Sequence, residues 1–401
     1  MDNRIDQSFL NSKNLRRLLI IGVILVGANL RVPLTSAGAL VSFIRDDFGI
    51  SNALAGAITT LPLIAFALLS PFAPKLANKI GMERTIAISL ILLITGILIR
   101  SASGISLLFT GTLMVGLAIA VGNVLIPGII KMNFPYKIGL MTGLYAIVMN
   151  VFGALGSGLS IPIATSGDLG WRGSLMIWAL LAFITLLIWL PQLMKKHTGK
   201  KKLNNQKIGG MLRSPLAWKI TLFMGAQSLI FYTLITWLPT ILTASGYDIQ
   251  LAGWGVFIFQ FASIPFTFII PVIADKMKNQ VLIAIVSSGM IFIGVAGLLA
   301  GFSDLSLLWI IMLGVGNGSA FSLSMMFFTL RTRDGYEAAE LSGMAQSFGY
   351  LLAAVGPVMV GGLQDLTGSW TLPLTMLAVF SAVMLVTGMA AGKNKQVSNN
   401  I

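Results

Sequence analysis

The chain has 401 residues, of which 56% are hydrophobic and only 10% are charged, and its mean hydropathy is +0.89. A water-soluble core of this length does not require so apolar a composition, so the sequence predicts a polytopic membrane protein. The absence of cysteine excludes a disulfide framework and a thiolate metal site.

Apolar runs long enough to cross a membrane follow one another along the chain. A helix that spans a hydrocarbon layer of ~30 Å needs about 20 mostly apolar residues. The expected fold class is therefore all-α integral membrane, with twelve transmembrane helices. The spans are predicted near 16–41, 52–73, 85–104, 107–130, 139–163, 174–194, 217–243, 250–273, 281–302, 306–330, 339–363 and 371–391.

The basic residues predict the orientation of these spans. The formal charge of +14 raises the question of nucleic-acid binding, which the placement of the 27 Lys and Arg residues decides. All of them lie in segments on one side of the membrane except Arg31, Arg45, Arg100 and Arg172. The positive-inside rule then places both termini in the cytoplasm, and no nucleic-acid partner is expected. The N-terminus carries acids and lacks a small-residue cleavage site, so no removable signal peptide is predicted.

The two halves of the sequence share short motifs at corresponding spans. "VGN" occurs at 121–123 and 315–317, "PKLANKI" at 74–80 corresponds to "PVIADKM" at 271–277, and "GAN" at 27–29 to "GAQ" at 225–227. The polar, basic stretch after span six reads as a linker. The predicted domains are an N-terminal six-helix bundle at 1–194, a cytoplasmic linker at 195–216 and a C-terminal bundle at 217–401. Two pseudo-symmetric bundles around a midplane site are typical of alternating-access transporters.

The loop after span two carries a motif that resembles the major facilitator superfamily signature G-x-L-A-D-[RK]-x-G-[RK]-[RK]. Here the loop reads "PKLANKIGMER", and Asn78 stands where the signature has aspartate. The second copy has the acid as Asp275. The resemblance implies a gating role for Asn78, Lys79, Gly81, Arg84, Asp275 and Lys276.

Longer stretches narrow the resemblance. "GWRGSLMIWALLAFITLLIWLP" at 170–191 and "LSGMAQSFGYLLAAVGPVMVGGLQDLTGSW" at 341–370, with "ANLR" at 28–31, are similar to the cyanate permease and nitroimidazole transporter family. The resemblance implies a monomeric, multi-pass carrier of small solutes in a bacterial cytoplasmic membrane.

Arg31 is the only charged residue between Leu18 and Leu40. It follows Arg17 by roughly 21 Å of helix at ~1.5 Å per residue, which places it just beyond the membrane midplane. Insertion of an arginine there costs about 2.5–3.5 kcal/mol, and the 13 Asp and Glu residues are predicted in loops and at span ends. Arg31 either snorkels to the outer headgroups or faces a cavity and binds an anion or strong acceptor.

Neutral polar and aromatic residues complete the predicted substrate site. The amides Asn29, Asn123, Gln227 and Gln346 would supply hydrogen bonds, and the rings of Tyr145, Tyr232 and Tyr350 would line the cavity. Asn150, Gln260, Asn317 and Trp237 could also line the cavity, and the alternative for every one of these residues is hydrogen bonding or packing between helices. Glycines at small-residue spacing predict tight helix contacts at Gly153, Gly156, Gly158, Gly343, Gly349 and Gly356, and Trp171 and Arg172 read as interface anchors.

The predicted function is secondary transport. No nucleophile, metal cluster or paired acids indicate an enzyme, and no phosphate loop of the form G-x-x-x-x-G-K-[ST] indicates ATP-driven pumping. A receptor is disfavoured because no sizeable soluble domain is predicted. The favoured solute is a small anion such as cyanate, and the alternative is export of nitroimidazole-type or other neutral or cationic drugs. No cofactor or metal is expected. His197 lies in the linker, so Glu340 is the residue through which proton coupling stays open.

Overall fold

The computed structural model describes residues 2–50, 52–165, 169–194, 210–247, 249–301 and 305–397. Over these ranges the chain is helical and contains no strand, which confirms the predicted class. Most of the predicted linker, including His197, lies outside the described residues. The chain divides into two compact units, Met1–Ile126 with Leu144–Lys207, and Pro127–Gly143 with Ile208–Ile401. Residues 127–143, the end of one long helix and the start of the next, therefore belong to the second unit.

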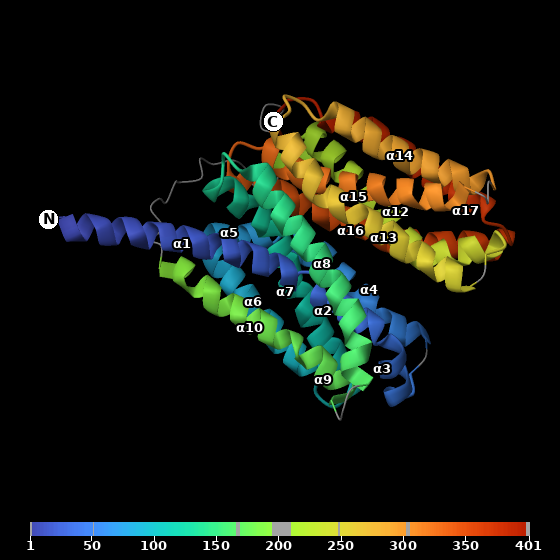
Figure 1. Ribbon diagram of the computed structural model, residues 1–401, viewed down its shortest axis with the longest axis horizontal. Helices are drawn as coiled ribbons and strands as arrows, with labels where there is room; N and C mark the ends of the chain where they lie inside the picture. The colour runs from blue at the N-terminus through green and yellow to red at the C-terminus, as the bar shows by residue number, and fades with distance from the viewer. Residues whose placement is uncertain are drawn as a thin grey trace. The chain divides into compact units, whose positions relative to one another are not determined.

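The first unit holds most of the N-terminal helices (Figure 1). Two of them, α7 and α8, continue into the second unit at 127–143. The helices are α1 (Asp2–Asn29), α2 (Val32–Ala39), α3 (Val41–Phe48), α4 (Asn52–Leu69), α5 (Ala73–Ile80), α6 (Met82–Arg100), α7 (Ile105–Asn133), α8 (Ile138–Thr165), α9 (Gly170–Met176), α10 (Trp178–Trp189) and the 3₁₀ turn η2 (Leu190–Met194).

The second unit is built from long helices that pack in pairs, α12 with α16 and α17, and α15 with α13 and α14. Its helices are α11 (Gly210–Arg213), α12 (Pro215–Ala244), α13 (Ile249–Lys276), α14 (Val281–Leu299), α15 (Ser306–Leu330), α16 (Gly335–Thr367) and α17 (Thr371–Ala391). Helix starts follow local chemistry: Asp334 caps α16 by accepting from the amides of Tyr336 (2.9 Å) and Glu337 (3.0 Å).

The described helices match the predicted spans in length and composition. Eleven are long and apolar enough to cross a membrane, and the second predicted span becomes the twelfth if Ala57–Leu69 and Ala73–Ile80, which meet at a bend of 56°, count as one. The span predicted at 52–73 is met by α4 as far as Leu69, and the motif stretch predicted as a loop after it forms the helix α5. The junction after it is Gly81, whose φ of 94° lies in the region that favours glycine.

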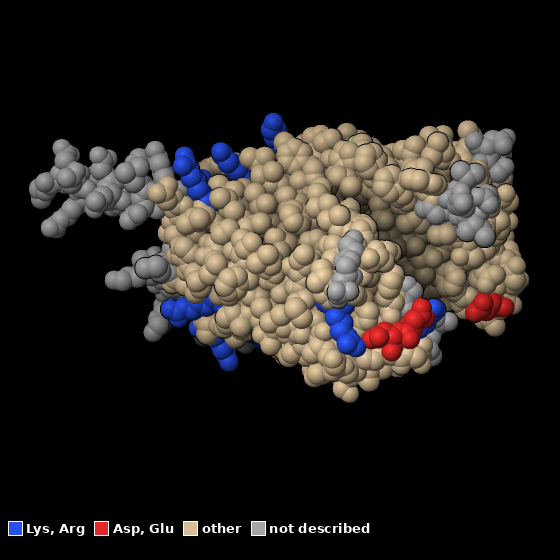
Figure 2. Space-filling model, turned by 60° about the horizontal axis from the view of Figure 1, so that its bottom comes forward, with Lys and Arg blue, Asp and Glu red and all other residues tan. Residues whose placement is uncertain are grey.

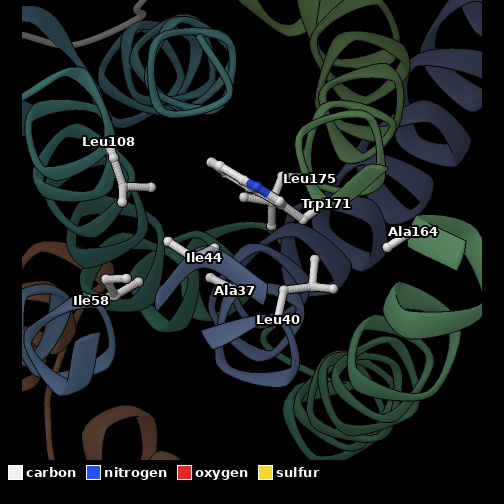
Figure 3. Close-up of a cluster of buried hydrophobic side chains, with 8 residues drawn as sticks. All are labelled: Ala37, Leu40, Ile44, Ile58, Leu108, Ala164, Trp171 and Leu175. Carbon is white, nitrogen blue, oxygen red and sulfur yellow. The ribbon is translucent and has the colours of Figure 1, made fainter. Parts of the chain in front are cut away.

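The apolar core of unit 1 contains a cluster to which six helices contribute (Figure 3). Trp171, predicted as an interface anchor, is 7% exposed and packs in this cluster, and its indole donates to Asp47 (3.3 Å). Arg172 pairs with the same carboxylate at 2.9 Å. The buried members are Ala37, Leu40, Ile44, Ile58, Leu108, Ala164, Trp171 and Leu175.

Leu175→Ala is expected to destabilise unit 1. Leu175 is fully buried in the cluster, so truncation removes transfer free energy and leaves a cavity, at a cost of about 2–5 kcal/mol. The melting temperature of the detergent-solubilised protein measures the effect. Leu187→Ala on α10 is the matched control, because Leu187 is 49% exposed and its truncation leaves no enclosed cavity. Equal melting of the two variants would contradict the assignment of this cluster as core.

A buried arginine ties together one end of unit 2. Arg331, directly after α15, donates from Nε to the carbonyl of Ala391 (2.7 Å), and from Nη2 to Gly392 (2.9 Å) and to Gln280. Its own carbonyl accepts the amide of Val397 at 2.9 Å. Burial lowers the pKa of Arg331 to about 10, so the guanidinium stays charged at neutral pH. Residues 391–397 are thus part of the folded unit.

Charged side chains occupy little of the surface. On the face drawn in Figure 2, most of the area carries neither Lys and Arg nor Asp and Glu. Large apolar side chains are exposed instead, among them Leu68 (65%), Phe261 (64%) and Val358 (76%). A surface of this kind is stable against lipid tails, in agreement with the predicted spans.

Candidate substrate site

The first predicted span is interrupted at Leu30 and Arg31. Pro33 lacks the amide hydrogen that would bond to the carbonyl of Asn29, and its ring crowds that carbonyl, so α1 ends at Asn29. The chain resumes helical structure as α2, with the carbonyl of Arg31 accepting from the amides of Leu34 (3.0 Å) and Thr35 (3.0 Å). Arg31 therefore stands at a break between two half-helices, an arrangement that transporters use at binding sites.

Helix α8 forms the wall against which the Arg31 side chain lies. Arg31 Nη1 donates to Asn150 Oδ1 at 2.8 Å, and the Asn150 amide is oriented by donating to the carbonyl of Ala146 (2.9 Å). The stem of Arg31 crosses Gly153, where an added Cβ would lie 2.9 Å from Arg31 Cδ. At Gly156 it would lie 3.0 Å from the carbonyl oxygen of Val32. Gly158, in contrast, faces open space.

Two more predicted residues of unit 1 meet close by. The Tyr145 hydroxyl donates to Asn123 Oδ1 at 3.2 Å, and both side chains are buried. The Tyr145 ring also packs on α1, since a Cβ on Gly27 would lie 2.9 Å from Tyr145 Cδ2. The structure thus brings Arg31, at the break after α1, together with Asn123 on α7 and with Tyr145 and Asn150 on α8. From the sequence, Asn150 is one of the midspan polar residues that could complete the cavity or bond between helices.

Asn29 points elsewhere despite its proximity to Arg31 in the sequence. Its Nδ2 donates to Thr185 Oγ1 on α10 (2.8 Å) and to the carbonyl of Leu25 (2.9 Å). Asn29 is the last residue of α1 and Arg31 lies in the break after it, so the two side chains need not share a face. Asn29 therefore connects α1 to α10 in this structure.

The predicted residues of unit 2 have three separate sets of partners. Gln227 Nε2 on α12 donates to Asn317 Oδ1 on α15 at 2.6 Å, and Ser228 donates to Gln227 Oε1 at 3.2 Å. The rings of Tyr232 and Tyr350 meet edge to face with centroids 6.5 Å apart. Gln346 donates to Ser342 Oγ at 2.9 Å. The partner of Gln227 is Asn317, which the repeated "VGN" motif marks in the sequence.

The signature-motif residues lie at helix ends. Within unit 1, Lys79 and Arg84 are exposed, and Asn78 Oδ1 is buried with no hydrogen-bond partner among the described residues. Gly81 forms the left-handed junction between α5 and α6.

In unit 2, Asp275 is half-buried where α13 meets the start of α8, since a Cβ on Gly139 would lie 2.5 Å from Asp275 Cβ. Lys276 is exposed. The sequence did not single out Lys131, which donates to the carbonyls of Thr329, in the last turn of α15, and of Thr332, just after it, all within unit 2. Glu340 is half-buried near the charges of Glu337 and Asp334.

Comparison with known proteins gives consistent matches over nearly the whole chain. The family model described as Major Facilitator Superfamily matches residues 19–357. An uncharacterized transporter, YycB, of Bacillus subtilis (strain 168) is 46% identical over 94% of each chain. A 2-nitroimidazole transporter of Escherichia coli (strain K12) is 40% identical over 97% of this chain and 98% of its own. The cyanate transport protein CynX of the same strain is 25% identical over 88% of this chain and 91% of its own.

A solved structure shares the fold. The proton:xylose symporter XylE superposes with a TM-score of 0.71 at 14% sequence identity, and the match covers 96% of this chain and 97% of that one.

Proposed function

This chain belongs to the major facilitator superfamily and is a multi-span membrane transporter, not an enzyme, and on that premise we propose that its solute is a small anion bound by Arg31. The single observation that carries the proposal is the placement of the Arg31 guanidinium at a helix break, 2.8 Å from the neutral amide oxygen of Asn150.

The chemistry of this pair favours an anionic group. Asn150 orients the guanidinium through one nitrogen but brings no negative charge of its own. A guanidinium presents five N–H donors in a planar fork that matches two acceptor atoms side by side. A carboxylate provides two such acceptors together with negative charge, and linear cyanate provides a single terminal acceptor that carries negative charge. The cyanate transport protein among the relatives supports this substrate class.

A second candidate is a neutral nitroaromatic solute, and the 40% identical 2-nitroimidazole transporter favours it. A nitro group carries two oxygens in the same planar arrangement as a carboxylate, so the guanidinium fork of Arg31 suits both. The edge-to-face rings of Tyr232 and Tyr350 would suit a flat ring. Under this candidate the protein exports a small drug.

Competition in proteoliposomes separates the candidates. The purified protein is reconstituted with radiolabelled cyanate, and unlabelled benzoate, 2-nitroimidazole and imidazole are added in turn. If Arg31 selects anions, benzoate inhibits uptake, whereas imidazole does not. Inhibition by 2-nitroimidazole but not by imidazole would assign recognition to the nitro oxygens. Absence of cyanate uptake, with uptake of labelled imidazole, would overturn the proposal.

We further propose that both termini face the cytoplasm, on the strength of the one-sided distribution of Lys and Arg. The solute would then cross by alternating access driven by a gradient. This proposal includes three further roles. The helix-end residues of the signature motif act as gates, and Glu340 takes part in proton coupling. Further contacts to the solute come from Asn123, Tyr145, Gln227, Tyr232, Gln346 and Tyr350.

A further inference from the structure

A second arginine of unit 1 is buried more deeply than Arg31. Arg100, the last residue of α6, is 1% exposed and donates from Nη1 to the carbonyl oxygen of Pro33 at 2.7 Å. Its Nε and Nη2 are buried and find no acceptor among the residues that the structure describes. From the sequence, Arg100 is counted among the few basic residues on the outer side of the membrane, although it lies inside the span predicted at 85–104.

Fold stability does not account for this arginine. A buried cation needs a counter-charge or a full set of hydrogen bonds, and within the described part of the chain Arg100 makes one hydrogen bond, to a neutral carbonyl. Each buried donor without an acceptor opposes folding. An apolar side chain of similar length at this position would avoid that cost, which indicates that Arg100 serves a purpose other than stability.

The carbonyl oxygen that accepts the hydrogen bond from Arg100 belongs to Pro33, in the first turn of α2. Pro33 follows Arg31 by two residues, immediately after the break in the span. Helix α8 supports α2 at Gly156, where an added Cβ would lie 2.5 Å from Thr35 Oγ1 and 3.0 Å from the carbonyl oxygen of Val32. Helix α7 in turn presses on Arg100, since a Cβ on Gly111 would lie 2.6 Å from Arg100 Cβ. The short helix α2 is therefore held by α6 and by α8.

We propose that Arg100 is a positioning residue for the transported solute: by holding the Pro33 carbonyl it fixes the direction of α2 and thereby the place of the Arg31 guanidinium. This inference rests on the proposed role of Arg31 in binding the solute. Arg100 itself does not touch the solute in this scheme.

A single cysteine on α2 tests, without any substrate, whether Arg100 holds this helix in place. The chain contains no cysteine, so Thr35→Cys creates a single thiol on α2, at the contact with Gly156. We expect Arg100→Met to raise the rate of labelling by a small methanethiosulfonate reagent at least about tenfold, the change that follows from losing a charge-assisted hydrogen bond. The melting temperature should stay equal or rise. Arg100→Lys should label at a rate near that of the parent.

Arg45→Met serves as the matched control, because the Arg45 side chain is 40% exposed and pairs with Asp46. It should change neither labelling nor melting. Unchanged labelling in Arg100→Met, or faster labelling accompanied by a fall in melting temperature that Arg100→Lys does not reverse, would overturn the proposal in favour of a purely structural role.

Cyanate transport provides the functional arm. With Arg100→Met we expect the KM for cyanate to rise about tenfold while the protein remains monodisperse, and Arg100→Lys to restore most of it. An unchanged KM beside altered labelling would overturn the link from α2 to solute binding. Unchanged transport in Arg31→Ala would instead reject the proposed function, and the labelling result would still decide whether Arg100 holds α2.

Discussion

Replacing Arg31 with alanine should weaken cyanate binding by about 100-fold, since truncating one partner of a buried, hydrogen-bonded charge pair costs about 2–5 kcal/mol. Arg31 lies at the break between α1 and α2, where its charge is held against Asn150 and the glycines of α8. Arg31→Lys should retain part of the affinity, because the ammonium keeps the charge but loses the planar fork. Equilibrium binding to the purified protein measures both.

A charge-matched control separates recognition from general electrostatics. Arg45→Ala also removes one positive charge from unit 1, but from an exposed pair with Asp46. It should leave cyanate binding unchanged, since surface ion pairs are screened and contribute little. If Arg31→Ala and Arg45→Ala bind cyanate equally well, the solute is recognised elsewhere in the chain.

Introducing leucine at Gly314 should prevent unit 2 from packing. On α15 a Cβ at Gly314 would overlap the carbonyl oxygen of Phe259 on α13 and lie 2.9 Å from Ala262 Cβ. Backbone atoms cannot rotate away as side chains can, so the two helices must separate, at a cost beyond the 1–3 kcal/mol typical of overpacking. We expect no monodisperse protein on size exclusion in mild detergent.

The matched substitution is Gly289→Leu on α14, where an added Cβ meets nothing within 4 Å. This variant should elute as the parent does, because a leucine there enters open space and also favours the helix. Similar aggregation of both variants would show that the insertion of any leucine into these helices is harmful. Normal elution of Gly314→Leu would contradict the close approach of α13 and α15.

The sequence predicted where the helices lie better than where they bend. Spans at 306–330 and 371–391 coincide with α15 and α17, because long apolar runs between loops leave few alternatives. The break at Arg31 was predicted as continuous helix, although Pro33 is visible in the sequence. Whether a membrane helix tolerates a proline depends on the neighbours that satisfy the freed carbonyls, and those neighbours are far away in the chain.

In the candidate site, the hydrogen-bond partners of the side chains were also harder to predict from the sequence than the positions of the helices. The repeats "GAN" and "GAQ" place Asn29 and Gln227 at corresponding positions, and both amides are buried, but Asn29 bonds to Thr185 and Gln227 to Asn317. Glutamine is one methylene longer, so equivalent positions reach different partners. Arg100 was misplaced because it ends an apolar run, where a cation is usually exposed. In the structure it is 1% exposed, and the packing of α7 against it contributes to this burial.

The attachment of residues 391–397 to Arg331 bears on biosynthesis. The guanidinium that organises the end of α15 takes its acceptors from Ala391 and Gly392, and its carbonyl takes the amide of Val397. Those groups are synthesised some sixty residues after the arginine. Until these residues have been translated, the Arg331 guanidinium must stay hydrated. The second unit therefore completes its folding only after the ribosome has passed residue 397.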